Sequence, residues 1–139
     1  MVLIRIGTIH TTYRNTAGLP LQPCCSGGTE GYIEVDEPYE AGLKDLEGFD
    51  RIWICYWFDR TQAARLRVTP YCDTQERGVF ATRVPNRPNP IGITCVQLLS
   101  VNGRMLQIKD VDVLDGTPLL DIKPFVPKYD IFAAKRCGW

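Results

Sequence analysis

The densest group of residues that could do chemistry lies at positions 77–92, Arg-Gly-Val-Phe-Ala-Thr-Arg-Val-Pro-Asn-Arg-Pro-Asn-Pro-Ile-Gly. Three prolines fix the backbone of this segment, which lowers the entropy cost of holding Arg83, Arg87 and Asn89 in place. An arginine presents a planar fork that suits phosphate or carboxylate, and an asparagine offers a donor and an acceptor that suit a base edge or an amide. The segment therefore predicts a preorganised binding loop, with a stiff connection and solvated arginines as the alternative.

A second group of polar residues lies at positions 110–124, Asp-Val-Asp-Val-Leu-Asp-Gly-Thr-Pro-Leu-Leu-Asp-Ile-Lys-Pro. The alternation predicts that Asp110 and Asp112 share one face of a strand and that two valines occupy the other face. Asp115 begins a turn with the sequence Asp-Gly-Thr-Pro. Carboxylates that face a pocket bind ribose hydroxyls or an amine, stabilise a cation or accept a proton, whereas carboxylates that face solvent have no such role. The residues alone leave both orientations open.

Other common catalytic and nucleotide sites find little support in the sequence. Gly27, Gly28 and Gly31 lack the Gly-x-Gly-x-x-Gly spacing, and no Gly-Lys-Ser or Gly-Lys-Thr is present to form a phosphate loop. His10 is the only histidine, so a Ser-His-Asp or Cys-His arrangement would depend on one side chain of a type that is more often structural or solvated. These observations argue against a Rossmann domain and a P-loop.

The six cysteines carry no Cys-x-x-Cys spacing, so neither a zinc site nor a redox pair is predicted, and no metal is expected. Cys55 and Cys95 fall inside predicted strands and are expected to be small core residues. Cys24 and Cys25 lie in a long loop, where they line a ligand pocket or only pack the loop, and both alternatives remain open. Because no apolar N-terminal run has the length of a signal peptide, free thiols and a cytoplasmic location are expected.

Length and composition favour one globular domain over residues 1–139, with a mass of 15.7 kDa, 45% hydrophobic and 23% charged residues. The net charge is zero, which argues against a polybasic protein that binds nucleic acid through bulk charge. Residues 60–109 nevertheless carry eight basic and two acidic side chains, which indicates a local anion-binding surface or an ordinary solvated one. The longest apolar run, Ile52–Phe58, is much shorter than the ~18 residues of a membrane span, so no membrane partner is expected.

Short strands must position these groups. Apolar and β-branched runs predict them at 2–12, 32–35, 52–58, 78–82, 94–101, 105–111 and 119–122. One short helix is expected over 38–46, Asn102-Gly103 predicts a type I′ turn, and an irregular tail is expected from about residue 128. The pattern predicts a mainly β fold, a small six- or seven-stranded β-barrel with one short helix, rather than a Rossmann fold.

Four motifs make the sequence similar to a known family. They are Gly-Val-Phe-Ala-Thr-Arg at 78–83, Arg-Pro-Asn-Pro-Ile-Gly at 87–92, Asp-Gly-Thr-Pro at 115–118 and Asp-Ile-Lys-Pro at 121–124. Together they resemble the tRNA N6-threonylcarbamoyladenosine methyltransferase family. The likeness covers nearly the whole chain, from Ile-Arg-Ile-Gly-Thr-Ile at 4–9 to about Pro127.

The resemblance implies a homodimeric β-barrel that binds S-adenosylmethionine and methylates N6 of threonylcarbamoyladenosine beside the tRNA anticodon. It implies cofactor contacts at Pro23, Cys24, Cys25, Arg60, Thr61, Arg83, Ile93, Asp112, Val113, Leu114 and Asp115. It also implies residues that shape the site or hold the tRNA, namely Arg87, Asn89, Asp121 and Lys123. Asp115 is the candidate catalytic base, with stabilisation of the cationic cofactor as its other possible role. A non-catalytic nucleotide- or RNA-binding module on the same barrel is the alternative function.

Overall fold

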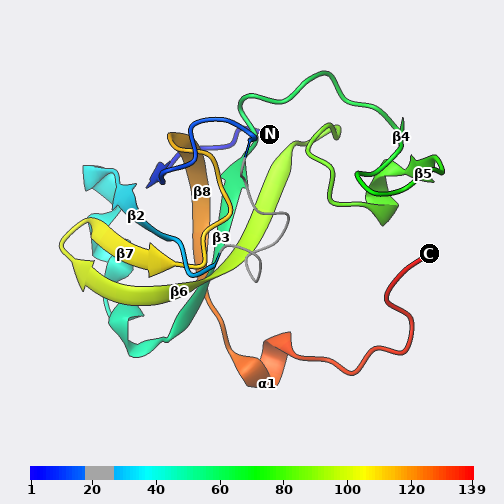
Figure 1. Cartoon of the computed structure of the whole chain (residues 1–139). Helices are drawn as coiled ribbons and strands as arrows, with labels where there is room; N and C mark the ends of the chain where they lie inside the picture. Colours follow the sequence, from blue (N-terminus) through cyan, green and yellow to red (C-terminus); the bar gives the residue numbers. More distant parts are fainter. Residues whose placement is uncertain (18–26) are drawn as a thin grey trace.

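Six antiparallel strands close into a barrel in the order β1–β2–β7–β6–β3–β8, so the first and last strands of the chain pair with each other. The structure is a computed structural model that describes residues 1–17 and 27–139, and Figure 1 shows β4 and β5 set apart from the barrel. The predicted mainly β barrel is confirmed. Its strands are β1 Gly7–His10, β2 Glu30–Val35, β3 Arg51–Trp57, β6 Ile91–Asn102, β7 Met105–Lys109 and β8 Thr117–Pro124.

Alternate side chains of each strand fill the barrel interior, as the period of two of a β-strand requires. In β3, Ile52, Ile54 and Tyr56 are buried, and the residues between them are only half-buried. The other buried residues of this core are Ile9, Ile33, Val35, Leu43, Val96, Leu98, Leu106, Ile108, Val111, Val113 and Leu119.

The two cysteines of β3 and β6 lie on the outer face of the barrel. Cys55 and Cys95 are half-buried and occupy the positions between the core residues, so the prediction that they are core residues is wrong. The alternation was hidden in the sequence because the outer positions of β3 also carry large apolar side chains, Trp53 and Trp57. An apolar run of this kind does not tell its two faces apart.

The predicted hairpin between β6 and β7 is confirmed, but the predicted type I′ turn at Asn102-Gly103 is wrong. Asn102 pairs with Met105, so Gly103 and Arg104 are the central residues of the turn. Only Gly103, at φ +59°, has a positive φ, whereas a type I′ turn requires a positive φ at both central residues. The second strand ends earlier than predicted, because the backbone at Asp110 adopts φ +65° and leaves the strand conformation. The side chains beyond it still alternate, with Val111 and Val113 buried and Asp112 half-buried. The expected separation of acidic and apolar faces therefore exists, although a loop rather than a strand provides it.

The first strand is also shorter than the predicted range 2–12. The pairing of β1 with β2 begins at Gly7, opposite Val35, where β2 ends. Residues 1–5 extend past that end, and Val2 and Ile4 are 86% and 60% exposed. A β-branched sequence forms a strand only where a neighbouring strand is present to pair with it.

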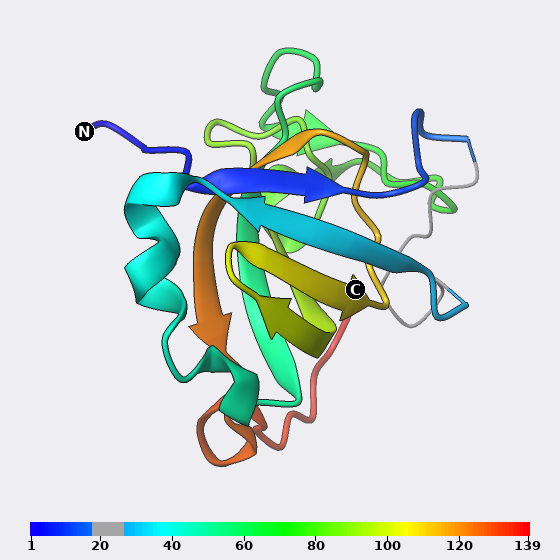
Figure 2. The ribbon, with the colours of Figure 1, turned by 90° about the vertical axis from the view of Figure 1, so that its left-hand side faces the viewer.

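Short helices flank the barrel. The 3₁₀ helices η2 Glu37–Leu43 and η3 Leu46–Gly48 run beside β8 (Figure 2), so the predicted helix is confirmed in place, although it is 3₁₀ rather than α. The tail holds one turn of helix, α1 Pro127–Asp130, and is otherwise irregular as predicted. No helix in the described ranges has the length and apolar character needed to cross a membrane.

Residues 59–90 form an arm that leaves the barrel after β3 and returns to it at β6 (Figure 1). The arm contains β4 Arg67–Val68, β5 Arg77–Gly78 and the 3₁₀ helix η4 Val79–Ala81. The predicted strand over 78–82 is wrong beyond its first residue, because Val79 is buried and the Thr82 hydroxyl donates to its carbonyl oxygen at 2.8 Å, which closes a turn.

The tail packs against this arm. The indole Nε1 of Trp139 donates to the carbonyl oxygen of Ala81 at 2.8 Å, and the Arg77 guanidinium lies 4.2 Å from the centre of the indole ring. These two contacts connect the tail to the arm on the side away from β1 and β2 (Figure 1).

Candidate functional site

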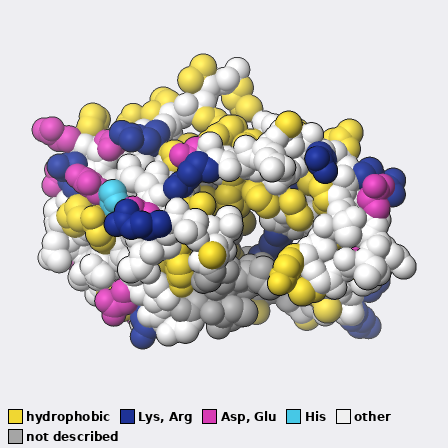
Figure 3. All heavy atoms as spheres, turned by 45° about the horizontal axis from the view of Figure 1, so that its top comes forward, with side chains coloured by type: hydrophobic (Ala, Val, Ile, Leu, Met, Phe, Trp, Pro, Cys, Tyr) yellow, Lys and Arg dark blue, Asp and Glu magenta, His cyan; other side chains and the backbone are white. Residues whose placement is uncertain are grey.

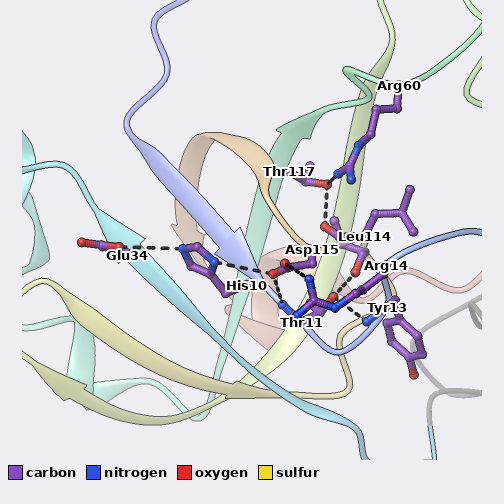
Figure 4. Close-up of polar contacts among 10 residues, drawn as sticks. His10, Thr11, Tyr13, Arg14, Glu34, Arg60, Leu114, Asp115 and Thr117 are labelled. Carbon is purple, nitrogen blue, oxygen red and sulfur yellow. Dashed lines mark hydrogen bonds and ion pairs between the residues drawn. The ribbon is translucent and has the colours of Figure 1, made fainter.

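The candidate site lies where β1 ends and the loop before β8 begins (Figure 4). The Thr11 amide donates to Asp115 Oδ1 at 3.0 Å, and its hydroxyl donates to the carbonyl oxygen of Val113 at 2.7 Å. In return, the amide of Asp115 donates to the carbonyl oxygen of Tyr13 at 2.7 Å. These bonds join segments that are more than 100 residues apart and fix the position of the 112–115 loop.

Asp115 faces two basic side chains as well as this amide. Its carboxylate lies 3.5 Å from Nδ1 of His10 and 3.9 Å from a guanidinium nitrogen of Arg14. The other imidazole nitrogen of His10 lies 3.7 Å from Glu34, and the ring stacks on Tyr32 with centroids 4.6 Å apart. Sequence reasoning gave His10 no role, because its two carboxylate neighbours come from other elements of the barrel.

Arg60 extends from the start of the arm to the same loop (Figure 4). Its guanidinium donates to the Thr117 hydroxyl at 3.1 Å, and that hydroxyl donates to the carbonyl oxygen of Leu114 at 2.7 Å. The structure thus brings Arg60 together with the predicted cofactor residues of the 112–115 loop.

Thr61 carries a buried polar atom. Its hydroxyl oxygen forms no hydrogen bond with any described residue. A buried hydroxyl in this condition is costly, because it has lost its water without gaining a protein partner. A ligand group that reaches Thr61 would remove this cost.

Asp112 ends a chain of hydrogen bonds that begins inside the barrel. The Thr94 hydroxyl donates to Asp112 Oδ1 at 2.8 Å, and the Tyr56 hydroxyl lies 3.0 Å from that of Thr94. Burial raises the pKa of Asp112 above its ordinary value, and burial raises the pKa of Tyr56 to about 12. The positive charge of Arg83 acts on both groups and lowers both pKa values, so Arg83 also belongs to this neighbourhood. A threonine at an inward-facing strand position was the signal that could have revealed this chain.

The proline-rich loop 83–90 contains no regular element, as predicted. Arg87 is half-buried, and one of its guanidinium nitrogens donates to the carbonyl oxygens of Thr82 and Val84 at 3.0 and 3.1 Å. Arg87 thus stabilises the loop that carries Arg83. Arg83 and Asn89 are exposed.

Three predicted site residues lie elsewhere, on the outer face of the barrel. Ile93 is 53% exposed, and it lies in β6 opposite Cys55 of β3. Asp121 also pairs with Cys55, from β8, and its carboxylate forms an ion pair with Lys123 at 2.8 Å. The structure therefore does not join these residues to the Asp115 loop within one chain. Pro23, Cys24 and Cys25 lie outside the described residues.

The surface around the Asp115 loop is mixed in charge. Figure 3 shows the histidine among basic and acidic side chains. A separate groove of about 340 Å³ between η2 and β8 is mainly apolar and contains only Asp121 of the predicted site. Among residues 1–17 and 27–139, no three His, Cys, Asp or Glu side chains are grouped so that they could hold a metal ion.

Comparison with known proteins relates this geometry to a family. Residues 8–131 match the model of the tRNA-methyltransferase O N-terminal domain. The chain is 47% identical, over 96% of its length and 73% of the relative, to a protein of Pyrococcus abyssi named a probable S-adenosyl-L-methionine-binding protein. It is 33% identical to the mouse tRNA (adenine(37)-N6)-methyltransferase over 90% of this chain and 31% of the mouse protein. The crystal structure of TrmO from Pseudomonas aeruginosa superimposes with a TM-score of 0.84 and 33% identity over 98% of this chain and 60% of that one.

Proposed function

Because the chain belongs to the tRNA-methyltransferase O N-terminal domain family, we propose that it is an S-adenosylmethionine-dependent methyltransferase that acts on N6 of adenosine 37 in tRNA. The names of the Pyrococcus and mouse relatives support the methyl donor and the acceptor, respectively. The observation that carries the proposal is the link from Arg60 through the Thr117 hydroxyl to the 112–115 loop at one end of the barrel, with the buried Thr61 hydroxyl next to Arg60 in the chain.

The residues at this end of the barrel suit S-adenosylmethionine. When bound, this cofactor supplies a methyl group on a positively charged sulfur. The unpartnered hydroxyl of Thr61 offers a hydrogen bond to its polar groups, and the carboxylates of Asp112 and Asp115 offer negative charge to the sulfonium. The other described residues of the proposed cofactor site are Arg60, Arg83, Ile93, Val113 and Leu114.

The proposed acceptor is N6 of threonylcarbamoyladenosine. Acylation makes the proton on this nitrogen more acidic and the nitrogen a poorer nucleophile, so the proton must leave as methyl transfer proceeds. Asp115 has two candidate roles here: it accepts this proton, or it serves as the negative partner of the cofactor. Contacts with tRNA are proposed for Arg87, Asn89, Asp121 and Lys123.

We also propose that two copies of the chain form a homodimer. The outer face of β6 exposes Ile91, Ile93 and Leu99 by 41%, 53% and 41%, and a second copy would cover this apolar surface. Ile93 belongs to the proposed cofactor set yet lies on this outer face, which supports a site that the second copy completes. An Ile93→Lys variant should shift the protein toward the monomer in analytical ultracentrifugation and lose cofactor affinity at the same time.

The described cysteines Cys55, Cys72, Cys95 and Cys137 are free thiols, which fits the proposed reducing cytoplasm. The test of function begins with calorimetric titration of S-adenosylmethionine, with ATP as control, followed by transfer of labelled methyl to tRNA with and without the threonylcarbamoyl group. Saturable binding of the methyl donor and transfer only to modified tRNA would support the full proposal. Binding without transfer would favour the non-catalytic module, and transfer to unmodified tRNA would overturn the proposed acceptor.

A further inference from the structure

The two carboxylates at this end of the barrel have different surroundings. Asp115 accepts an amide hydrogen bond from Thr11 and faces the basic side chains of His10 and Arg14. Asp112 is half-buried between the core residues Val111 and Val113, and it accepts a side-chain hydrogen bond from Thr94. When two carboxylates of one site have unlike environments, they usually have unlike roles.

The hydrogen-bond chain behind Asp112 has one direction. Thr94 and Tyr56 are 2% and 4% exposed, so no bulk water competes for their hydroxyl groups. Thr94 gives its only hydroxyl proton to Asp112, so Tyr56 must be the donor in the 3.0 Å contact with Thr94. The chain therefore runs from Tyr56 through Thr94 and ends on the Asp112 carboxylate, the only one of the three groups that can take up a proton near neutral pH.

The pKa values agree with this direction. Burial raises the pKa of Tyr56 to about 12, which keeps its proton in place as a donor. Burial also raises the pKa of Asp112, while the Thr94 hydrogen bond and the charge of Arg83 limit the rise. A carboxylate that is ionised but more basic than usual is suited to accept a proton during a reaction.

We infer that Asp112 is the catalytic base that takes the proton from the acceptor nitrogen, and that Thr94 and Tyr56 are its positioning residues. This inference rests on the proposed methyltransferase function and leaves Asp115 the role of charge partner. In the methyl-transfer step, the acceptor nitrogen forms a bond to the methyl carbon. The carbon–sulfur bond breaks at the same time, and both of its electrons stay on sulfur. The N–H proton moves to Asp112, so the positive charge of the sulfonium and the negative charge of the carboxylate disappear together.

The first test compares Asp112→Asn with Asp115→Asn. Asparagine at 112 keeps an oxygen for the Thr94 hydrogen bond, so the variant should fold with a melting temperature at neutral pH no lower than that of the wild type. Its kcat should fall by about 100-fold or more, the usual contribution of a general base, and this loss should exceed the loss of S-adenosylmethionine affinity that follows from removing one negative charge. Asp115→Asn should instead weaken cofactor binding and retain a measurable kcat. Asp110→Asn is the matched control, because Asp110 pairs with Arg51 at 3.2 Å outside this site.

The second test uses the ligand-free protein. Thr94→Val removes a hydrogen bond that lowers the pKa of Asp112, so the titration of Asp112 in carboxyl ¹³C NMR should move to higher pH. The rise of kcat with pH should move in the same direction, which a purely structural role of Thr94 would not produce. Normal kcat in Asp112→Asn, or an unmoved pH profile in Thr94→Val, would overturn this inference alone. Absence of methyl transfer by the wild type would overturn the proposed function and the inference together.

Discussion

Gly92→Ala should destabilise the protein, because the aromatic side chains beside Gly92 leave no room for a Cβ atom. Gly92 pairs with Tyr56 across β6 and β3, and the Tyr56 ring covers the backbone of Gly92. A Cβ at Gly92 would lie 2.5 Å from Tyr56 Cζ and 2.9 Å from Phe58 Cζ. Both distances are too short for carbon atoms, so the two aromatic rings must move.

The size of the effect follows from three contributions. Overpacking a core costs about 1–3 kcal/mol, and losing the buried Tyr56–Thr94 hydrogen bond costs about 1 kcal/mol. Alanine offsets these by about 0.5–1 kcal/mol, because glycine is unfavourable inside a strand. The net loss is about 1–3.5 kcal/mol, and since a chain of this length loses about 3 °C per kcal/mol, the melting temperature should fall by about 3–10 °C.

The assay is thermal unfolding followed by circular dichroism, with urea unfolding as a second measurement. Gly78→Ala is the matched control, because a Cβ at Gly78, at the end of a strand in the arm, meets no atom within 4 Å. In a Tyr56→Phe background the hydrogen bond is already absent, so Gly92→Ala should show only the cost of overpacking less the gain from alanine. A Gly92→Ala protein as stable as the wild type would refute the reasoning.

Three further predictions concern other described residues. Thr61→Val should leave the melting temperature of the ligand-free protein unchanged or raise it, because it removes a hydroxyl that has no partner among the described residues. The same variant should bind S-adenosylmethionine about fivefold more weakly in calorimetry, because one hydrogen bond to the cofactor is lost. Unchanged affinity would contradict this role of Thr61. Cys55 should react with iodoacetamide more slowly than the exposed Cys72 at pH 8, because burial raises the pKa of the Cys55 thiol; equal rates in mass spectrometry would contradict the burial argument. The hydrogen bond from Arg77 lowers the pKa of Asp73, so this contact stabilises the arm above the ordinary carboxyl pKa and stops doing so as the pH falls through the lowered value. Asp73→Asn should therefore speed hydrogen exchange of the β4–β5 amides at pH 7, and the difference from the wild type should disappear in acid, whereas equal exchange at pH 7 would exclude the contact as a source of stability.

Sequence patterns correctly predicted those elements whose conformation depends only on residues that are close together in the chain. The hairpin between β6 and β7 needs only its turn residues and two flanking apolar strands, and it forms where predicted, although its turn is centred on Gly103 and Arg104 and is not type I′. The strand over 78–82 was wrong because a tertiary contact, the burial of Val79, decides the conformation there. The orientation of Cys55 was wrong because an apolar run with apolar residues on both faces has no visible alternation.

The candidate site could be predicted only in part for the same reason. The 112–115 loop and Arg60 follow from motifs, and the structure brings them together. The contacts of His10 with Glu34 and Asp115 depend on the pairing register of β1 with its neighbours, which no single segment encodes. The role of Thr94 could have been predicted from the sequence, because a threonine at an inward-facing strand position requires a hydrogen-bond partner.

The pairing of β1 with β8 has a consequence for the kinetics of folding. The seam, as we call the pairing of β1 with β8, joins the first and the last strand of the barrel. Thr11 and Asp115, which form a hydrogen bond beside this seam, are 104 residues apart. Contacts of such long sequence separation form late and make folding slow. The candidate site therefore does not exist in a partly folded chain whose seam is still open. A ligand bound beside the seam should slow unfolding and leave the rate of folding nearly unchanged, because the transition state does not yet contain the site.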